Sequence, residues 1–154
     1  ARKNSVGSGE KLHGMGVSKK CGEIDMIMID TSAWIEYFQD GIQSVAQKVD
    51  TCLDQERVAI GDIVFCEVMQ GLRSPRERRK VSELLLSLPK FDMVGFEMAQ
   101  KSASNYRLLR SKGVTVRKTI DVLIGTFCAE NGFKLIHNDS DFDLMARHIG
   151  LDVL

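Results

Sequence analysis

Four acidic residues that lie far apart in the sequence are the strongest candidates for chemistry: Asp30, Glu67, Asp121 and Asp139. Carboxylates that are brought together repel one another unless a cation lies between them. Oxygen ligands of this kind suit Mg²⁺ or Mn²⁺, with water filling the remaining coordination positions. A divalent ion that is open on one side can bind a phosphate oxygen and lower the pKa of a bound water. Gathered by the fold, these acids predict a metal site for phosphoryl chemistry.

Asp30 ends an apolar run that predicts a buried strand. Residues 27–29, Ile-Met-Ile, lack the alternation of a half-exposed strand, as expected where both faces are covered. Thr31 or Ser32 can cap the helix that follows. That helix carries three apolar side chains: Trp34, Ile35 and Phe38. Asp30 is therefore expected at the carboxyl end of a strand, the edge of an open α/β sheet where ligands bind.

The rest of the chain alternates between strand and helix patterns. The predicted strands after the first cover residues 57–60, 91–94, 133–136 and 151–154. The predicted helices cover residues 42–53, the segment around Glu67, the segment from a Ser74 cap to the stop at Leu88-Pro89, 97–111, 119–130 and a short stretch through Arg147. Such alternation predicts an α/β fold with a mostly parallel sheet and helices on both faces.

Composition narrows the class of protein. The 154 residues, 44% hydrophobic and 27% charged, suit one globular domain, and a formal net charge of +0 argues against binding nucleic acid by bulk charge. The four cysteines form no CxxC pair and have no histidines at zinc spacing, which favours reduced, structural thiols. Neither an apolar run of about 20 residues nor a secretory signal is present, so we expect a soluble, cytoplasmic protein.

The sequence predicts a flexible tail at residues 1–25 and the folded domain at residues 26–154. The first segment is rich in Gly, Ser and Lys and shows no sustained periodicity. It derives either from cloning or from an upstream start, and the fold prediction leaves it out.

Each acid also has a purely structural interpretation. Asp30 could simply cap a helix, and Asp121 could serve only as a first-turn acid, where the helix dipole favours negative charge. Asn138 and Asp139 could serve only to shape a turn. Glu67 lies among apolar neighbours and needs a polar partner if it is buried.

Taken in order, the motifs resemble those of the PIN-domain family, and more narrowly the VapC-type ribonuclease toxins of bacterial and archaeal toxin–antitoxin pairs. The resemblance extends from Met26 to the C-terminus. Four segments carry it: Ile29-Asp30-Thr31-Ser32 with the following Trp34-Ile35, Glu67 followed by Gly71-Leu72, residues 119–124 (TIDVLI) and residues 137–142 (HNDSDF). His137 departs from the family pattern, which often has Thr or Ser there, and we expect it to be a hydrogen-bonded loop residue.

The resemblance implies a PIN-like three-layer α/β/α sandwich around a mostly parallel sheet of four to five strands. It implies that Asp30, Glu67, Asp121 and Asp139 are the catalytic and metal-binding residues, with Thr31, Asn138 and Asp141 as auxiliary residues. The implied activity is Mg²⁺- or Mn²⁺-dependent cleavage of structured RNA, such as tRNA or rRNA, by a toxin that stops translation. The implied protein partners are a cognate VapB-type antitoxin, whose C-terminal segment lies across the active-site groove, and a second copy of the chain in a homodimer.

Two basic clusters could hold phosphates beside the acids. Arg117 and Lys118 immediately precede the Asp121 segment and are therefore the better RNA-binding candidates. The second cluster consists of Arg73, Arg76, Arg78, Arg79 and Lys80, and ordinary solvated helix charges account for it equally well.

Two other functions stay open on the sequence alone. A phosphatase with Asp30 as its nucleophile is disfavoured, because Ser32 stands where the usual second Asp would be and a Gly-rich phosphate loop is missing. A non-catalytic PIN-like module that binds RNA or protein is disfavoured by the presence of all four acids.

Overall fold

A sheet of parallel strands forms the centre of the protein. The computed structural model describes residues 25–39, 41–55 and 57–154. Within these ranges five strands lie in the order β3-β2-β1-β4-β5, and every neighbouring pair is parallel. The strands are β1 (Ile27–Ile29), β2 (Val58–Gly61), β3 (Lys90–Phe91), β4 (Lys134–Ile136) and β5 (Asp152–Val153). The predicted parallel sheet is confirmed, while residues 1–24 of the predicted tail lie outside the described residues.

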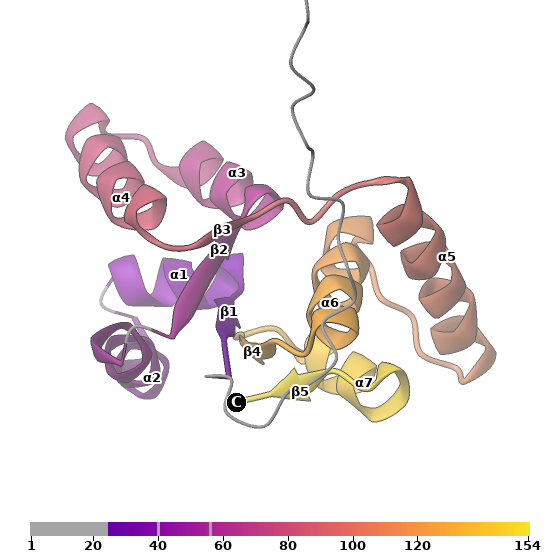
Figure 1. Ribbon diagram of the computed structural model, residues 1–154. Coiled ribbons are helices and arrows are strands. Elements are labelled where there is room, and N and C mark those ends of the chain that lie inside the picture. Colours follow the sequence, from indigo (N-terminus) through magenta and orange to yellow (C-terminus); the bar gives the residue numbers. More distant parts are fainter. Residues whose placement is uncertain (1–24, 40, 56) are drawn as a thin grey trace, which may run out of the picture.

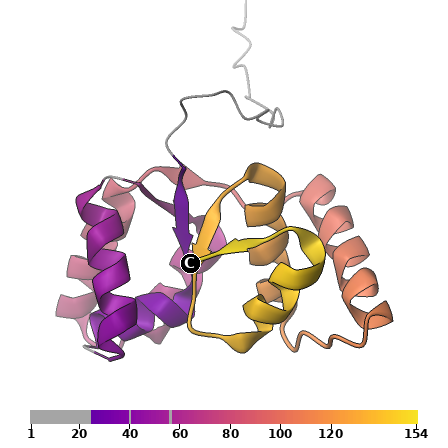
Figure 2. The same ribbon diagram turned by 90° about the horizontal axis from the view of Figure 1, so that it is seen from below.

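Helices cover both faces of this sheet. On one side lie α1 (Thr31–Phe38), α2 (Gln43–Asp54), α3 (Asp62–Gly71) and α4 (Pro75–Ser87), and on the other lie α5 (Phe96–Ser111), α6 (Thr119–Asn131) and α7 (Ser140–Ile149). Two views at right angles show the same division (Figures 1 and 2). The result is the predicted three-layer sandwich.

The central strand is apolar because it is covered from both sides. Ile27, Met28 and Ile29 are at most 1% exposed. Trp34 of α1 and Phe142 of α7 are also fully buried and belong to the same core cluster. Burial of side chains of this size contributes roughly 1.5–3 kcal/mol each, so the layers hold β1 and the residue that follows it in a fixed position.

Local signals account for most helix ends, with one correction. Ser74 caps α4 through a hydrogen bond from the Glu77 amide, and Gly132 ends α6 in the left-handed conformation at φ 69°, as expected. The cap of α1 is Asp30, which the sequence also allowed as a cap, rather than Thr31 or Ser32, because Asp30 stays extended and its carboxylate accepts the Ser32 amide.

The third strand is also displaced from its predicted range of 91–94. β3 forms at Lys90–Phe91, and Met93 instead donates its backbone N–H to the Asp62 side chain. This strand lies at the edge of the sheet, where pairing with β2 alone sets its length.

The described cysteines are free thiols, as predicted, and the described helices have limited length and hydrophobicity. Cys52 and Cys128 are buried, Cys66 is exposed, and all three are free thiols. Cys21 lies outside the described residues. In the ranges that the structure describes, helices are too short or too polar to cross a membrane.

Candidate functional site

The candidate site lies at the carboxyl edge of the sheet, where β1 and β4 run side by side. Ile29 pairs with Ile136 at the ends of these strands, and the Asp30 amide donates to the Ile136 carbonyl at 2.8 Å. From β1 the chain proceeds to β2 on one side, whereas β4 lies on the other. This is the switch point in strand order that forms a crevice in open α/β sheets.

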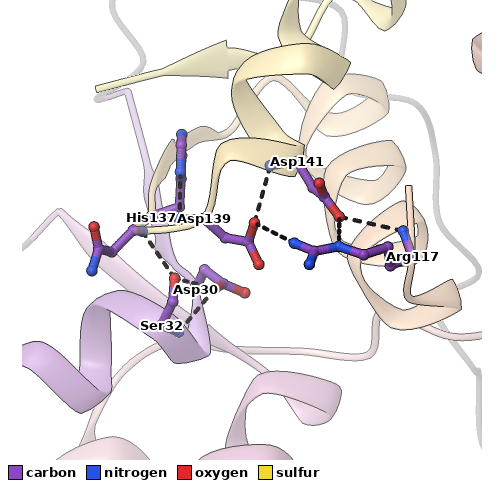
Figure 3. A network of polar contacts seen from close by, with 7 residues as sticks. Asp30, Ser32, Arg117, His137, Asp139 and Asp141 are labelled. Carbon is purple, nitrogen blue, oxygen red and sulfur yellow. Dashed lines mark hydrogen bonds and ion pairs between the residues drawn. The ribbon is translucent and has the colours of Figure 1, made fainter. Parts of the chain in front are cut away.

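Asp30 is held at this edge by the first turn of α1. It is 4% exposed, and its Oδ2 accepts two hydrogen bonds from Ser32, at 2.9 Å from the amide and at 2.6 Å from the hydroxyl. The Ser32 hydroxyl oxygen in turn accepts the Asn138 amide at 2.9 Å. Figure 3 shows this connection between α1 and the segment after β4. Ser32 was not among the predicted site residues.

Glu67 is brought to the same edge by α3. The Thr31 hydroxyl donates to Glu67 Oε2 at 2.7 Å, over a separation of 36 residues. Glu67 is half-buried, so this bond supplies the polar partner that its apolar surroundings require. Thr31 therefore connects the start of α1 to α3.

Asp139 and Asp141 form an acidic pair at the start of α7. The Asp141 amide donates to Asp139 Oδ1 at 3.0 Å, which caps the helix. Arg117 contacts both acids (Figure 3): its Nε lies 3.5 Å from Asp141 Oδ2, and its guanidinium lies 4.0 Å from Asp139 Oδ1. Its backbone N–H also donates to Asp141 at 3.3 Å. The Arg117 side chain is 74% exposed, so it bridges this acidic pair and solvent.

Asp121 lies in the first turn of α6 and is 4% exposed. Burial raises the pKa of its carboxyl to about 6, Lys118 opposes this rise, and the negative charges of Asp30, Asp139 and Glu67 add to it. Among the described residues, Asp121 Oδ2 is a buried oxygen that accepts no hydrogen bond. The other three predicted acids therefore all act electrostatically on Asp121, and one buried oxygen of Asp121 is without a donor.

The remaining predicted residues take less central positions. His137 accepts the Asp139 amide through Nδ1 and packs on Phe142, as expected for a loop residue. Lys118 is exposed beside Asp121. The second basic cluster is exposed on α4 and the segment before it, and no contact in the described structure joins it to the acids: Arg73, Arg76, Arg78, Arg79 and Lys80.

The oxygen atoms at this edge suit a hard divalent ion. Within the described ranges, no three or more His, Cys, Asp or Glu side chains lie close enough together to hold a metal ion as they stand. Mg²⁺ keeps several of its waters and needs only one or two direct carboxylates, so it does not require such a group. A buried carboxylate oxygen without a donor, on an acid whose pKa is raised in part by three other acids, has the character that a cation satisfies.

Comparison with known proteins identifies the family. A family model described as PIN domain matches residues 27–148. Ribonuclease VapC11 of Mycobacterium tuberculosis (strain ATCC 25618 / H37Rv) is 33% identical over 124 residues, which cover 79% of this chain and 92% of the relative. The chain belongs to the PIN-domain family, among the VapC ribonucleases.

This VapC-type PIN domain also resembles solved structures. VapBC2 from Rickettsia felis, bound to a DNA fragment from its promoter, matches with a TM-score of 0.67 and 17% identity, over 84% of this chain and 97% of that chain. DNA-bound VapBC from Salmonella typhimurium matches with a TM-score of 0.67 and 20% identity, over 85% of this chain and 98% of that chain. At these identities the likeness concerns the fold, and it confirms the PIN-like sandwich.

Proposed function

We propose that this protein is an endoribonuclease that depends on Mg²⁺ or Mn²⁺ and acts as the toxin of a toxin–antitoxin pair. The observation that carries the proposal is the convergence of Asp30, Glu67, Asp121 and Asp139 at the β1–β4 edge, with a buried Asp121 oxygen that lacks a donor. Membership in the VapC ribonucleases supports the choice of RNA over other phosphodiesters.

The four acids would hold the ion, and three of them have a distinct support. Asp30 is fixed by Ser32, Glu67 by Thr31, and Asp139 by the Asp141 amide. A bound ion would supply Lewis-acid activation of a phosphate oxygen and of a water nucleophile. Asp121 is ready for this role only when it is ionised, because a protonated carboxyl is a poor metal ligand.

Arg117 and Lys118 would bind the RNA backbone. Both are exposed, and both lie next to the acids, Arg117 through Asp139 and Asp141 and Lys118 through Asp121. A guanidinium that is largely solvent-exposed can leave its carboxylate partners for a phosphate at a small energetic cost. The substrate we propose is structured RNA, such as tRNA or rRNA, whose recognition depends on shape and on unpaired loops.

The protein partner we propose is a VapB-type antitoxin. A groove with a volume of about 860 Å³ lies among α1, α2, α3 and α4, and its lining includes Ile35, Phe38, Leu72 and Leu84. Ile35 is 42% exposed, an apolar side chain that a partner would cover. Solved relatives of this fold are VapBC complexes. Co-purification with the cognate antitoxin tests this partner, and we expect Ile35→Glu to reduce it. A homodimer, which we also propose, is tested by the molar mass from light scattering.

The activity is tested by incubating purified protein with total RNA in Mg²⁺, Mn²⁺ or EDTA, with wild type beside Asp121→Asn. We expect discrete fragments that require both the metal and Asp121, and sequencing of their ends identifies the target. Intact RNA in every condition, from folded and antitoxin-free protein, would favour a non-catalytic binding module instead.

A further inference from the structure

Glu36 makes contacts that the proposed function leaves without a role. It lies on α1 and is half-buried, and both of its carboxylate oxygens accept hydrogen bonds. Oε1 accepts from the Asn138 side-chain amide at 3.2 Å, across 102 residues of sequence, and Oε2 accepts from the Ile42 backbone amide at 2.7 Å. Glu36 thus joins three segments: α1, the start of α2 and the segment after β4.

A short chain of hydrogen bonds leads from Glu36 to Asp30. Glu36 fixes the Asn138 side chain, and the Asn138 backbone amide donates to Ser32 Oγ at 2.9 Å. An oxygen that accepts this bond directs its own hydrogen elsewhere, and the Ser32 hydroxyl donates to Asp30 Oδ2 at 2.6 Å. Ser32 therefore has one stable orientation as long as the Asn138 backbone stays in place.

Ser32 occupies only one of the two carboxylate oxygens of Asp30. Both donors of Ser32 bind Oδ2, and within the described residues no hydrogen bond reaches Oδ1. Oδ1 is then the oxygen that is available to a metal ion. Supports of this kind fix the orientation of a metal ligand, and their removal typically costs about 10–100-fold in metal affinity or activity.

Gly41 supplies an independent sign that the position of the Glu36 carboxylate matters to the packing. A Cβ placed on Gly41 would overlap Glu36 Oε2, the flexible end of that side chain. The loop between α1 and α2 therefore passes against the carboxylate without a side chain in between. A methyl group here would displace the Glu36 carboxylate while the backbone of Gly41 stays compatible with an L-residue.

The geometry points to Glu36 as a positioning residue that holds Asp30 in its metal-binding orientation through Asn138 and Ser32. This inference rests on the proposed function, because it assumes that Asp30 binds the ion. Glu36 acts by position and not by charge: a Gln at this site can accept the Ile42 amide and donate to Asn138 once the Asn138 amide turns over.

The test compares Glu36→Ala, Glu36→Gln and Gly41→Ala with wild type, by Mn²⁺ calorimetry and by steady-state RNA cleavage. We expect Glu36→Ala and Gly41→Ala to lower Mn²⁺ affinity and kcat by roughly tenfold with KM for RNA unchanged, and Glu36→Gln to retain most of both. Glu36→Ala combined with Asn138→Ala should be no worse than the more damaging single change, because both break one chain of contacts.

Tyr37→Phe is the matched control. The Tyr37 hydroxyl bonds to Asp50 at 2.9 Å, which also ties α1 to α2 but does not reach Ser32. We expect wild-type Mn²⁺ affinity and kcat from this variant. Three results would overturn the inference: a similar loss in Tyr37→Phe, an unchanged kcat in folded Glu36→Ala, or a loss in Glu36→Gln equal to that in Glu36→Ala. As long as wild type cleaves RNA, none of them affects the proposed function. Wild type that neither binds Mn²⁺ nor cleaves RNA would remove the proposed function itself.

Discussion

The two halves of the acidic site are held in different ways. On the α1 side, Asp30 and Glu67 accept hydrogen bonds from neutral hydroxyls, those of Ser32 and Thr31. On the α7 side, Asp139 and Asp141 lie beside the Arg117 guanidinium. Neutral donors fix an orientation and leave the full negative charge, whereas a cation fixes the acids and offsets part of that charge. The first half is thus suited to hold a metal ion by charge, and the second to hold the ion beside a bound phosphate.

The largest effect should follow from removing charge on the hydroxyl-held half. We expect Asp30→Asn to reduce RNA cleavage by roughly a thousandfold or more, because it removes a direct ligand of an ion that stabilises charge by several kcal/mol. Asp141→Asn should cost about tenfold, since Asp141 supports Asp139 and Arg117 instead. Steady-state cleavage of a defined RNA measures both. Equal losses in the two variants would mean that the halves do not differ in role.

A smaller effect is expected from Arg117, and it should depend on salt. Arg117→Gln should weaken RNA binding by about tenfold and reduce the slope of log affinity against log salt by about 1, as for one lost phosphate contact. Thr31→Val is the control from the other half, since it removes a neutral hydroxyl and should leave the slope unchanged. Filter binding of RNA in EDTA at several salt concentrations measures the slope. An unchanged slope in Arg117→Gln would assign Arg117 a purely structural role.

The smallest effect concerns the pH dependence of stability without metal. The pKa of Asp121 is raised to about 6 in the folded protein, so its folded state binds a proton more tightly than its unfolded state. The stability that this proton contributes is present at low pH and is lost as the pH rises through about 6. In EDTA, the free energy of unfolding of wild type relative to Asp121→Asn should therefore fall by about 1–2 kcal/mol from pH 5 to pH 7.5.

Denaturant unfolding at both pH values measures this difference. The comparison with Asp121→Asn cancels the titration of the histidines, which is common to both proteins. Added Mn²⁺ should reverse the trend, because the ion binds the ionised carboxylate. A difference between wild type and variant that does not change with pH would mean that Asp121 ionises normally in the fold.

Much of this arrangement follows from the sequence, because it depends on neighbours along the chain. The run Ile27–Ile29 ends at Asp30, and Asp139 follows β4, so the strand pattern and the parallel topology bring these two acids to one edge. The contact between Glu36 and Asn138 spans 102 residues and has no local signal. Arg117 is predicted to bind RNA because it precedes Asp121, but its pairing with Asp139 and Asp141 has no local signal either. That pairing depends on how α6 packs on α7.

The choice of cap at α1 shows a finer limit. Thr31 and Ser32 are good capping residues, but each has a distant partner: the Thr31 hydroxyl donates to Glu67, and the Ser32 hydroxyl accepts the Asn138 amide. Asp30 is left to cap the helix from its extended position at the strand end. Long-range partners thus overrode a local preference at the candidate site itself.

The central claim is that the acids at the β1–β4 edge bind a divalent ion, and Mn²⁺ calorimetry tests it most directly. Wild type, Asp121→Asn and Asp152→Asn are titrated at pH 7.5, the last replacing an exposed acid on β5. We predict saturable binding to wild type and Asp152→Asn and none to Asp121→Asn. Absence of binding to folded wild type, or binding to Asp121→Asn equal to that of wild type, would contradict the claim.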